Sequence, residues 1–396
     1  MSAVYEKPFA KAEYAKRVAD TKRRMQAAGF DLLICQDPAN MSWLTGFSGW
    51  SFYVPQCVLV HLEEEWPIWF GRAQDAKCAS VTTDLPERNI VPFSERLVQH
   101  KTEHPYDELA QLIESRGWDK ARIGVEMDAH YYTARCHAHL TKGLPNAKFS
   151  NNGDLVNWAR LVKSEGELKL MREAGKICTA AMNRGIAKMK PGVPQNHVIA
   201  EIYHAQTMGM PGGPGGDYAA ICPLMPVGEG TSTPHLTWSD APLPANALTM
   251  IEIAGSRRGY HAPLTRTIHL GKPPAEMQAV ARAVVEGVDA GLATAKPGAT
   301  AEQVEAAWQA VLRRNGLKKE SRVGYSVGLS FPPDWGERTV SLRPGDTTEL
   351  QAGMCFHIQA GVWLKDWGVA ISESFEVTDK GGARFCDVAR ELIVID

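Results

Sequence analysis

The chain has 396 residues, more than one hydrophobic core usually organises, so its length predicts two domains. Its 43 basic and 45 acidic side chains give a formal net charge of -2, which argues against nucleic acid or an anionic membrane as a partner. The N-terminus lacks a signal peptide's apolar core and no apolar run is long enough to span a membrane, so we expect a cytoplasmic protein. The 8 cysteines form no C-x-x-C pair, which favours reduced, buried thiols.

The first part of the chain alternates helix-like and strand-like segments. Apolar spacing predicts helices over 10–28 and 105–117, and strands over 30–36, 53–62, 65–71 and 122–128. Alternation of this kind is typical of an α/β domain. Long helical patterns begin near residue 155, so we predict an N-terminal α/β domain over 1–157, serving substrate access and dimer contacts, and a catalytic domain over 158–396.

The second part contains an internal repeat. The segment Lys-Pro-Gly follows one helical pattern at 190–192 and another at 296–298, and a further helix is predicted after each, over 195–208 and 301–315. Strands are predicted after both helix pairs, at 217–225, 250–271, 321–331, 353–364 and 368–377. Two such halves predict an α+β arrangement in which a sheet is backed by helices and a site lies on its concave face.

The hairpin MIEIAGSRRGYHAPLTRTIHLG, residues 250–271, poses a chemical question. Its first strand is predicted to end at Glu252, ahead of a turn over 255–259. Burying a carboxylate is costly, so Glu252 either serves function or forms a buried ion pair with one of the arginines at 257, 258 and 266. Two further segments, 226–235 and 330–338, are predicted as loops near a pocket.

The second part resembles the pita-bread family of creatinase, prolidase and aminopeptidase P. The resemblance rests on RLVKSEGELKLMREA (160–174), STPHLTWSD (232–240), the hairpin ending GYHAPLTRT, GYSVGL (324–329), LQAGMCFHIQAG (350–361) and GVAISESFEV (368–377). It covers roughly 160–396, and the segment before it is similar to the N-terminal domain of the same enzymes. The fold implied is a C-terminal pita-bread domain preceded by a smaller creatinase-type α/β domain.

Resemblance to the family's peptidases implies five metal-ligand positions, and this chain departs from the pattern at nearly every one. Asp, Asp, His, Glu and Glu hold two metal ions in the peptidases. The matching residues here are Glu252, Pro263, Tyr325, Gln359 and Ser372, with Glu373 beside the last. Proline offers no donor, and Tyr and Gln replace His and a bridging carboxylate poorly, so we expect no metal cofactor.

Among metal-free members of the family, the motifs are most similar to ectoine hydrolases. That resemblance implies ectoine, a zwitterion with a cyclic amidinium ring and one carboxylate, as the substrate, and C–N cleavage to N-acetyl-2,4-diaminobutyrate as the reaction. Glu252 would engage the amidine carbon or its N–H groups, and His235, which matches the catalytic His of creatinase, would move protons. Acceptance of 5-hydroxyectoine stays open, as do creatinase-like and metal-dependent Xaa-Pro peptidase or lyase activities.

A cationic substrate also favours aromatic faces around it. Aromatic residues at or beside the motifs include Phe331, Trp335 and Trp367. As substrate-binding candidates we take Trp238, Tyr260, His261, Tyr325, Gln359, Trp363 and Glu373, together with Arg72 for the carboxylate and Trp50 from the N-terminal domain. The family resemblance implies a homodimer in which Trp50 reaches the partner's site.

Overall fold

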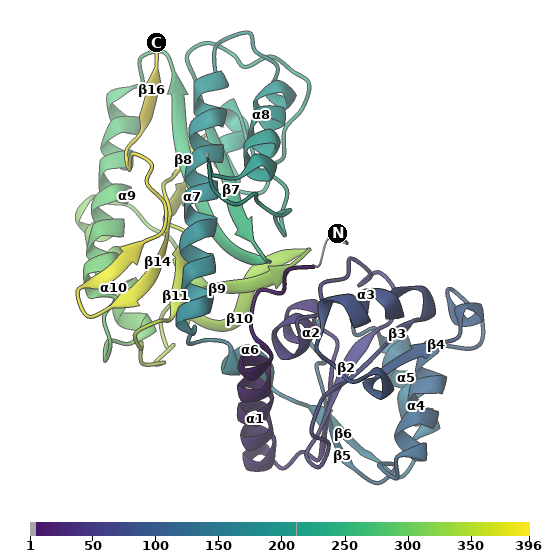
Figure 1. Ribbon diagram of the computed structural model, residues 1–396. Coiled ribbons are helices and arrows are strands. Elements are labelled where there is room, and N and C mark those ends of the chain that lie inside the picture. The colour runs from purple at the N-terminus through teal and green to yellow at the C-terminus, as the bar shows by residue number, and fades with distance from the viewer. Residues whose placement is uncertain (1–4, 211) are drawn as a thin grey trace. The chain divides into compact units, whose positions relative to one another are not determined.

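The computed structural model describes residues 5–210 and 212–396, so the first four residues of the predicted N-terminal domain lie outside the described part. The chain divides into two compact units, of which the first ends at Arg160 and the second begins at Leu161 (Figure 1). Within the described residues, no helix combines the length and the apolar character needed to cross a membrane. All eight cysteines are free thiols, and Cys222 is the exposed one.

The first unit is an α/β domain, as its alternating pattern predicts. Its sheet has the order β4-β3-β2-β1-β5-β6. Strands β1, β2 and β3 pair antiparallel, while β3–β4, β1–β5 and β5–β6 pair in parallel; the connections β3–β4 and β5–β6 each contain a helix. Its elements are α1 (Lys11–Ala28), β1 (Leu32–Cys35), α2 (Pro38–Thr45), β2 (Cys57–His61), β3 (Ile68–Arg72), α3 (Ala76–Thr82), β4 (Ile90–Phe93), α4 (Pro105–Ser115), β5 (Arg122–Val125), α5 (Ala134–Gly143), β6 (Lys148–Asn151) and α6 (Leu155–Ala159).

The second unit is built on a larger sheet, with the order β15-β14-β11-β9-β8-β16, in which β7 also pairs with β8 and β10 with β9. A separate small ribbon joins β12 to β13. Its elements are α7 (Glu165–Lys188), α8 (Gln195–Met208), β7 (Ala247–Arg257), β8 (Tyr260–Leu270), α9 (Ala275–Thr294), α10 (Ala301–Arg314), β9 (Gly324–Phe331), β10 (Asp334–Leu342), β11 (Cys355–Ile358), β12 (Gly361–Trp363), β13 (Gly368–Ala370), β14 (Glu373–Thr378), β15 (Gly381–Arg384) and β16 (Ile393–Ile395).

The internal repeat is present in this unit. A helix pair followed by a hairpin occurs first as α7, α8, β7 and β8, and again as α9, α10, β9 and β10 (Figure 1). The glycines of the two Lys-Pro-Gly turns, Gly192 and Gly298, have φ values of 85° and 86°. Both turns therefore use the left-handed backbone that glycine adopts without steric cost. Matching conformations at matching positions confirm the repeat that the sequence predicted.

The central hairpin differs from its prediction in two ways. Strand β7 continues to Arg257 and leaves only Arg258 and Gly259 for the turn, whereas the sequence pattern placed a turn over 255–259. Glu252 is therefore in the middle of the strand, opposite Thr265 of β8, and not at its end. Helix α7 packs closely against the strand at Gly255, since a Cβ at this position would lie 2.0 Å from the carbonyl oxygen of Ala174. The glycine marks close helix–strand packing.

Two other segments also differ from prediction. Residues 217–225 form no strand; only Leu224 pairs with Glu252, through two backbone hydrogen bonds of 2.9 and 3.0 Å. The segment 330–338, predicted as a loop, instead connects and extends the strands β9 and β10 across Pro332 and Pro333. The prolines of 330–338 suggested a loop, but they lie at the turn between two paired strands, where proline is tolerated. The apolar pattern of 217–225 suggested a strand, but it produces only an isolated bridge.

Candidate active site

A cavity of about 510 Å³ lies in the second unit. It brings together five of the predicted site residues, which are His235, Glu252, Tyr325, Gln359 and Trp363. The other residues that line it are Ile221, Leu224, Pro234, Lys319, Ser321, Arg322, Asp334 and Trp335. A volume of this size suits a small organic molecule.

Glu252 supplies a buried carboxylate to this cavity. Its side chain is only 7% exposed, and the amide Nε2 of Gln359 donates a hydrogen bond to its Oε2 at 3.1 Å. Burial raises the pKa of Glu252 to about 7, and the hydrogen bond from Gln359 opposes that rise. Two of the three arginines considered as partners pair elsewhere: Arg266 with Glu373 and Arg257 with Glu173. Glu252 therefore titrates in the range in which a carboxylate serves as base or nucleophile.

A buried cation lines the same cavity. Burial lowers the pKa of Lys319 to about 8, while the charge of Glu252 acts in the opposite direction. Its Nζ lies 4.2 Å from the ring centroid of Trp363, a cation–π contact. Its backbone carbonyl accepts a hydrogen bond from Gln309 of α10, which fixes the segment ahead of β9. The cavity thus holds a buried acid, Glu252, and a buried amine, Lys319.

Tyr325 lies in β9 and is embedded in polar contacts. The indole Nε1 of Trp335 donates to its hydroxyl at 2.8 Å, and Nδ1 of His357 lies 3.1 Å from the same oxygen. Burial raises the pKa of Tyr325, and the charge of Glu252 raises it further. The guanidinium of Arg322 lies 4.5 Å from the centre of the Tyr325 ring. The phenol is therefore held rigidly and stays protonated at neutral pH.

His235 reaches the cavity from the segment before β7. Its side chain is exposed, unlike that of Glu252. The short 3₁₀ helix Gly228–Ser232 precedes it, and the backbone N–H of Met225 donates to the carbonyl of Leu236, which holds this segment in place. An exposed imidazole that lines the same cavity as a buried carboxylate is suited to exchange protons with water.

Four polar or charged residues that line the cavity were missed by the sequence analysis: Lys319, Ser321, Arg322 and Asp334. Lys319 and Arg322 belong to the segment LKKESRVGYS, directly before the GYSVGL motif. The signal that could have identified them is the presence of basic residues immediately before a strand that carries a family motif. Asp334 follows the two prolines of a segment that was predicted as a loop near the pocket, so its neighbourhood was identified although its side chain was not.

Two predicted residues of β8 are committed elsewhere. Tyr260 is 1% exposed and its hydroxyl donates to Oε1 of Glu167 at 2.7 Å, at the start of α7. His261 accepts a hydrogen bond from the backbone N–H of Ala220 through Nε2 at 2.9 Å, and its Nδ1 donates to the carbonyl of Gly259. Burial lowers the pKa of His261 to about 4. His261 thus anchors the segment that brings Ile221 and Leu224 to the cavity, and neither residue lines it.

Glu373 and Trp238 also lie away from the lining. Glu373 is fully buried and pairs with Arg266 at 2.7 Å, so its carboxylate is used in an internal ion pair. Trp238 packs edge-on against Tyr203 of α8, with ring centroids 6.1 Å apart. Because successive residues at a strand point to opposite faces, Glu373 faces away from the side chain of Ser372.

The two candidates from the N-terminal unit form a local surface cluster there. Trp50 is 59% exposed and its ring lies 4.8 Å from that of Phe52. Arg72 pairs with Glu95 at 2.9 Å and donates weakly to the hydroxyl of Tyr53 at 3.4 Å. Arg72 is therefore engaged by a carboxylate of its own unit, while Lys319 and Arg322 provide cations at the cavity itself.

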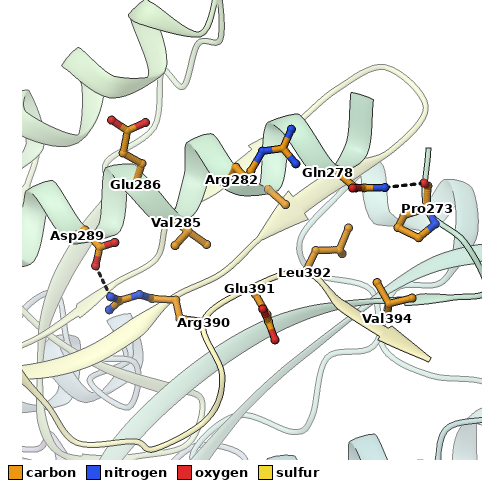
Figure 2. Close-up of a pocket in the computed structure, with 11 residues that line it drawn as sticks. Pro273, Gln278, Arg282, Val285, Glu286, Asp289, Arg390, Glu391, Leu392 and Val394 are labelled. Carbon is orange, nitrogen blue, oxygen red and sulfur yellow. Dashed lines mark hydrogen bonds and ion pairs between the residues drawn. The ribbon is translucent and has the colours of Figure 1, made fainter. Parts of the chain in front are cut away.

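A second cavity, of about 450 Å³, lies between α9 and the segment that leads into β16 (Figure 2). Three of its charged side chains are in ion pairs: Arg390 pairs with Asp289, as Figure 2 shows, and Glu286 pairs with Arg314. Gln278 donates to the carbonyl of Pro273 at 3.0 Å. None of the predicted site residues lines this cavity, so the candidate active site is the first one.

Comparison with known proteins shows which family has this two-domain architecture. Residues 17–162 match the creatinase/prolidase N-terminal domain, and residues 169–379 match metallopeptidase family M24, more than half of the chain. The chain belongs to the M24 family. It is 43% identical over 393 residues to ectoine hydrolase of Halomonas elongata, covering 98% of each protein. These matches make this M24 member a hydrolase.

Solved structures of other M24 proteins share the fold. Prolidase from Thermococcus sibiricus superposes with a TM-score of 0.84 at 19% identity, over 98% of this chain and all of that one. The X-Pro aminopeptidase from Thermotoga maritima superposes with a TM-score of 0.79 at 18% identity, over 96% and 99% of the two chains. At such identities the likeness concerns the fold alone. The pita-bread architecture with a creatinase-type N-terminal domain is thereby confirmed.

The residues at the peptidase metal positions do not fit a pair of metal ions. Tyr325 and Ser372 use their oxygens within a buried network with His357, and Pro263 has no donor. Glu252 accepts a hydrogen bond from Gln359, which offers an amide where a bridging carboxylate is needed. Within the described ranges, no group of three or more His, Cys, Asp or Glu residues is arranged to hold a metal ion.

Proposed function

We propose that this M24 hydrolase opens the amidine ring of ectoine, without a metal ion, to give N-acetyl-2,4-diaminobutyrate. One observation carries the proposal: a chain 43% identical to an ectoine hydrolase places a buried carboxylate, Glu252, in a cavity that His235 also lines. Ectoine combines a delocalised cation with a carboxylate. A buried acid, an aromatic lining and a nearby amine are complementary to those two charges.

The reaction follows from the chemistry of these groups. The amidine carbon is electron-poor because it is bonded to two ring nitrogens that share a positive charge. Ionised Glu252 either attacks this carbon or holds the amidinium N–H groups while water attacks. His235 takes a proton from water and gives one to the departing ring nitrogen, so that one C–N bond breaks and an acetamide remains. Water supplies the oxygen of that amide.

Lys319 is the proposed partner of the substrate carboxylate. It is buried, lines the cavity, and carries a charge below its pKa of about 8. A hydrogen bond to a charged group is worth about 1.5–3 kcal/mol, so Lys319→Met should raise KM about 10- to 100-fold. Lys318→Met, at the exposed neighbouring position, is the matched control and should leave KM unchanged. Equal KM values for the two variants would remove Lys319 from this role.

The activity is tested by incubating the purified protein with ectoine, 5-hydroxyectoine, creatine and a Xaa-Pro dipeptide, and identifying the products by mass spectrometry. Ring-opened ectoine, 18 mass units (about one water) heavier than the substrate, is the expected result. Sarcosine and urea from creatine would establish a creatinase instead, and free proline would establish a peptidase. Binding of ectoine without any product would make the protein a binding module.

We further propose a cytoplasmic homodimer, on the basis of the family resemblance, with Trp50 and its exposed neighbour Tyr53 near the partner's site. Light scattering after gel filtration measures the mass of the assembly against the 43.4 kDa chain. A monomer at micromolar concentration would contradict the dimer.

A further inference from the structure

Tyr325, at a former metal-ligand position, forms one end of a buried chain of polar groups. Its hydroxyl lies 3.1 Å from Nδ1 of His357, and Nε2 of that ring lies 2.7 Å from Oγ of Ser372. The backbone N–H of Thr265 donates to the same Ser372 oxygen at 2.7 Å. Both His357 and Ser372 are 0% exposed. The direction of each hydrogen bond in this chain can therefore be worked out from donors and acceptors.

The direction begins at Ser372. Its oxygen accepts the Thr265 N–H, so its own hydrogen needs an acceptor, and among the described residues Nε2 of His357 is the group placed to take it. Leaving a buried donor unpaired costs about 1–3 kcal/mol. Burial lowers the pKa of His357 to about 3, so the ring is neutral and carries one hydrogen. With Nε2 accepting, that hydrogen is on Nδ1.

The hydrogen on Nδ1 then points to Tyr325. The indole of Trp335 can only donate, so the Tyr325 oxygen accepts from both His357 and Trp335. Because the Tyr325 oxygen already accepts two hydrogen bonds, the hydroxyl can bind a further partner only by donating its own hydrogen. Tyr325 lines the cavity together with Glu252. An amidinium ring presents N–H donors, which would repel the Tyr325 hydrogen. The partner that matches this hydrogen in the cavity is therefore an oxygen atom.

We infer that Ser372, His357 and Trp335 lock the Tyr325 hydroxyl as a hydrogen-bond donor to the oxygen that adds to the substrate carbon during hydrolysis. The reaction it serves rests on the proposed function. Tyr325 is then a catalytic residue, while His357 and Ser372 are positioning residues that act through it. Without Ser372, no donor requires Nε2 to accept, so the His357 hydrogen is no longer fixed on Nδ1 and the Tyr325 hydroxyl is no longer locked as a donor to the cavity.

The first test is kinetic. Removing one donor of this kind typically lowers kcat about 100- to 1000-fold, so Tyr325→Phe should lower kcat to that extent with KM changed less than about threefold. Ser372→Ala should lower kcat about 10-fold or more, yet have no further effect in the Tyr325→Phe background. Ser374→Ala, which removes another buried serine bonded to a backbone carbonyl, is the matched control and should leave kcat unchanged. Additive effects, or a loss confined to KM, would overturn the inference.

The second test does not need turnover. Nitrogen NMR of the protein labelled in its 12 histidines distinguishes protonated from bare ring nitrogens, and His357→Gln assigns the signal. The expected tautomer of His357 has its hydrogen on Nδ1. An Nε2–H tautomer in the unmodified protein would overturn the inference whatever the substrate. The Nδ1–H form in a protein that leaves ectoine intact would uphold the network and reject the proposed function.

Discussion

At the scale of single residues, the candidate site depends on how Glu252 is solvated. Its carboxylate is buried and hydrogen-bonded by a neutral amide, so its charged form is disfavoured and its pKa reaches about 7. In the peptidase pattern this position carries an acid whose charge a metal would balance. Here Lys319 supplies one cation to the same cavity, and the cationic ring of the proposed substrate would add a second charge opposite Glu252.

The pH dependence of activity follows from that pKa. If ionised Glu252 is required, kcat/KM falls as the pH drops below about 7. Gln359→Met removes the hydrogen bond that favours the Glu252 anion. The acidic limb of the pH profile of kcat/KM should therefore move upward by about 1 pH unit or more. Gln278→Met, in the second cavity, serves as the control. A limb that stays in place in Gln359→Met would mean that another group controls it.

The same pKa predicts a stability effect. The pKa of Glu252 is about 7 in the folded protein and near 4.5 in the unfolded chain, so stability is lost as the pH rises from 4.5 through 7. Glu252→Gln carries no charge to bury, and at pH 8 it should be more stable by up to about 3 kcal/mol while having no turnover. Thermal unfolding at pH 8 and at pH 4.5 measures the difference, which should vanish at the lower pH. If the melting temperature changed equally at both pH values, the buried charge of Glu252 would not be the cause of the stability difference.

At the scale of secondary-structure elements, the central hairpin was recognised from its sequence but its strand length was not. The pattern Gly-Ser-Arg-Arg-Gly is typical of a turn, yet β7 runs through it to Arg257. The reason is tertiary: α7 lies against β7 so closely that Gly255 alone leaves room for the helix backbone. Local propensity cannot distinguish a glycine required by a turn from one required by a neighbouring helix.

Gly255→Ala tests this packing. Its Cβ would lie 2.0 Å from the carbonyl oxygen of Ala174 and 2.5 Å from the backbone nitrogen of Cys178, so α7 must move. Overpacking of this kind costs about 1–3 kcal/mol, and we expect a lower melting temperature together with reduced activity, since β7 carries Glu252. Gly215→Ala, where the nearest atom is at 3.5 Å, is the control. Equal melting temperatures for both variants would contradict the close approach.

At the scale of the whole molecule, the two repeated halves combine their strands in one sheet. Glu252 comes from β7, Tyr325 from β9 and Gln359 from the end of β11, and β9 adjoins both β8 and β11. In this arrangement the five positions that hold metals in the peptidases converge from distant parts of the chain. Here Glu252 and Gln359 bond each other, Tyr325 and Ser372 are joined through His357, and Pro263 offers no side-chain donor.

Chelation tests that conclusion for the intact protein. Ectoine hydrolysis should be unchanged after dialysis against EDTA, and elemental analysis should find less than about 0.1 equivalent of zinc, manganese, iron or cobalt per chain. Loss of activity on chelation and its recovery with one of these metals would restore a metal-dependent mechanism.

The sequence by itself determined the two-part organisation and the repeat, because these depend on local patterns, and its resemblance to the family supplied the proposed roles of Glu252 and His235. Only the tertiary structure decided which neighbours reach them. Ser372 joins the network of Tyr325 while Glu373, one residue later, pairs with Arg266 on the other face. Lys319 enters the cavity from a segment without a motif. Side chains alternate along a strand, so the register of pairing between distant segments selects the face, and no local pattern encodes that register.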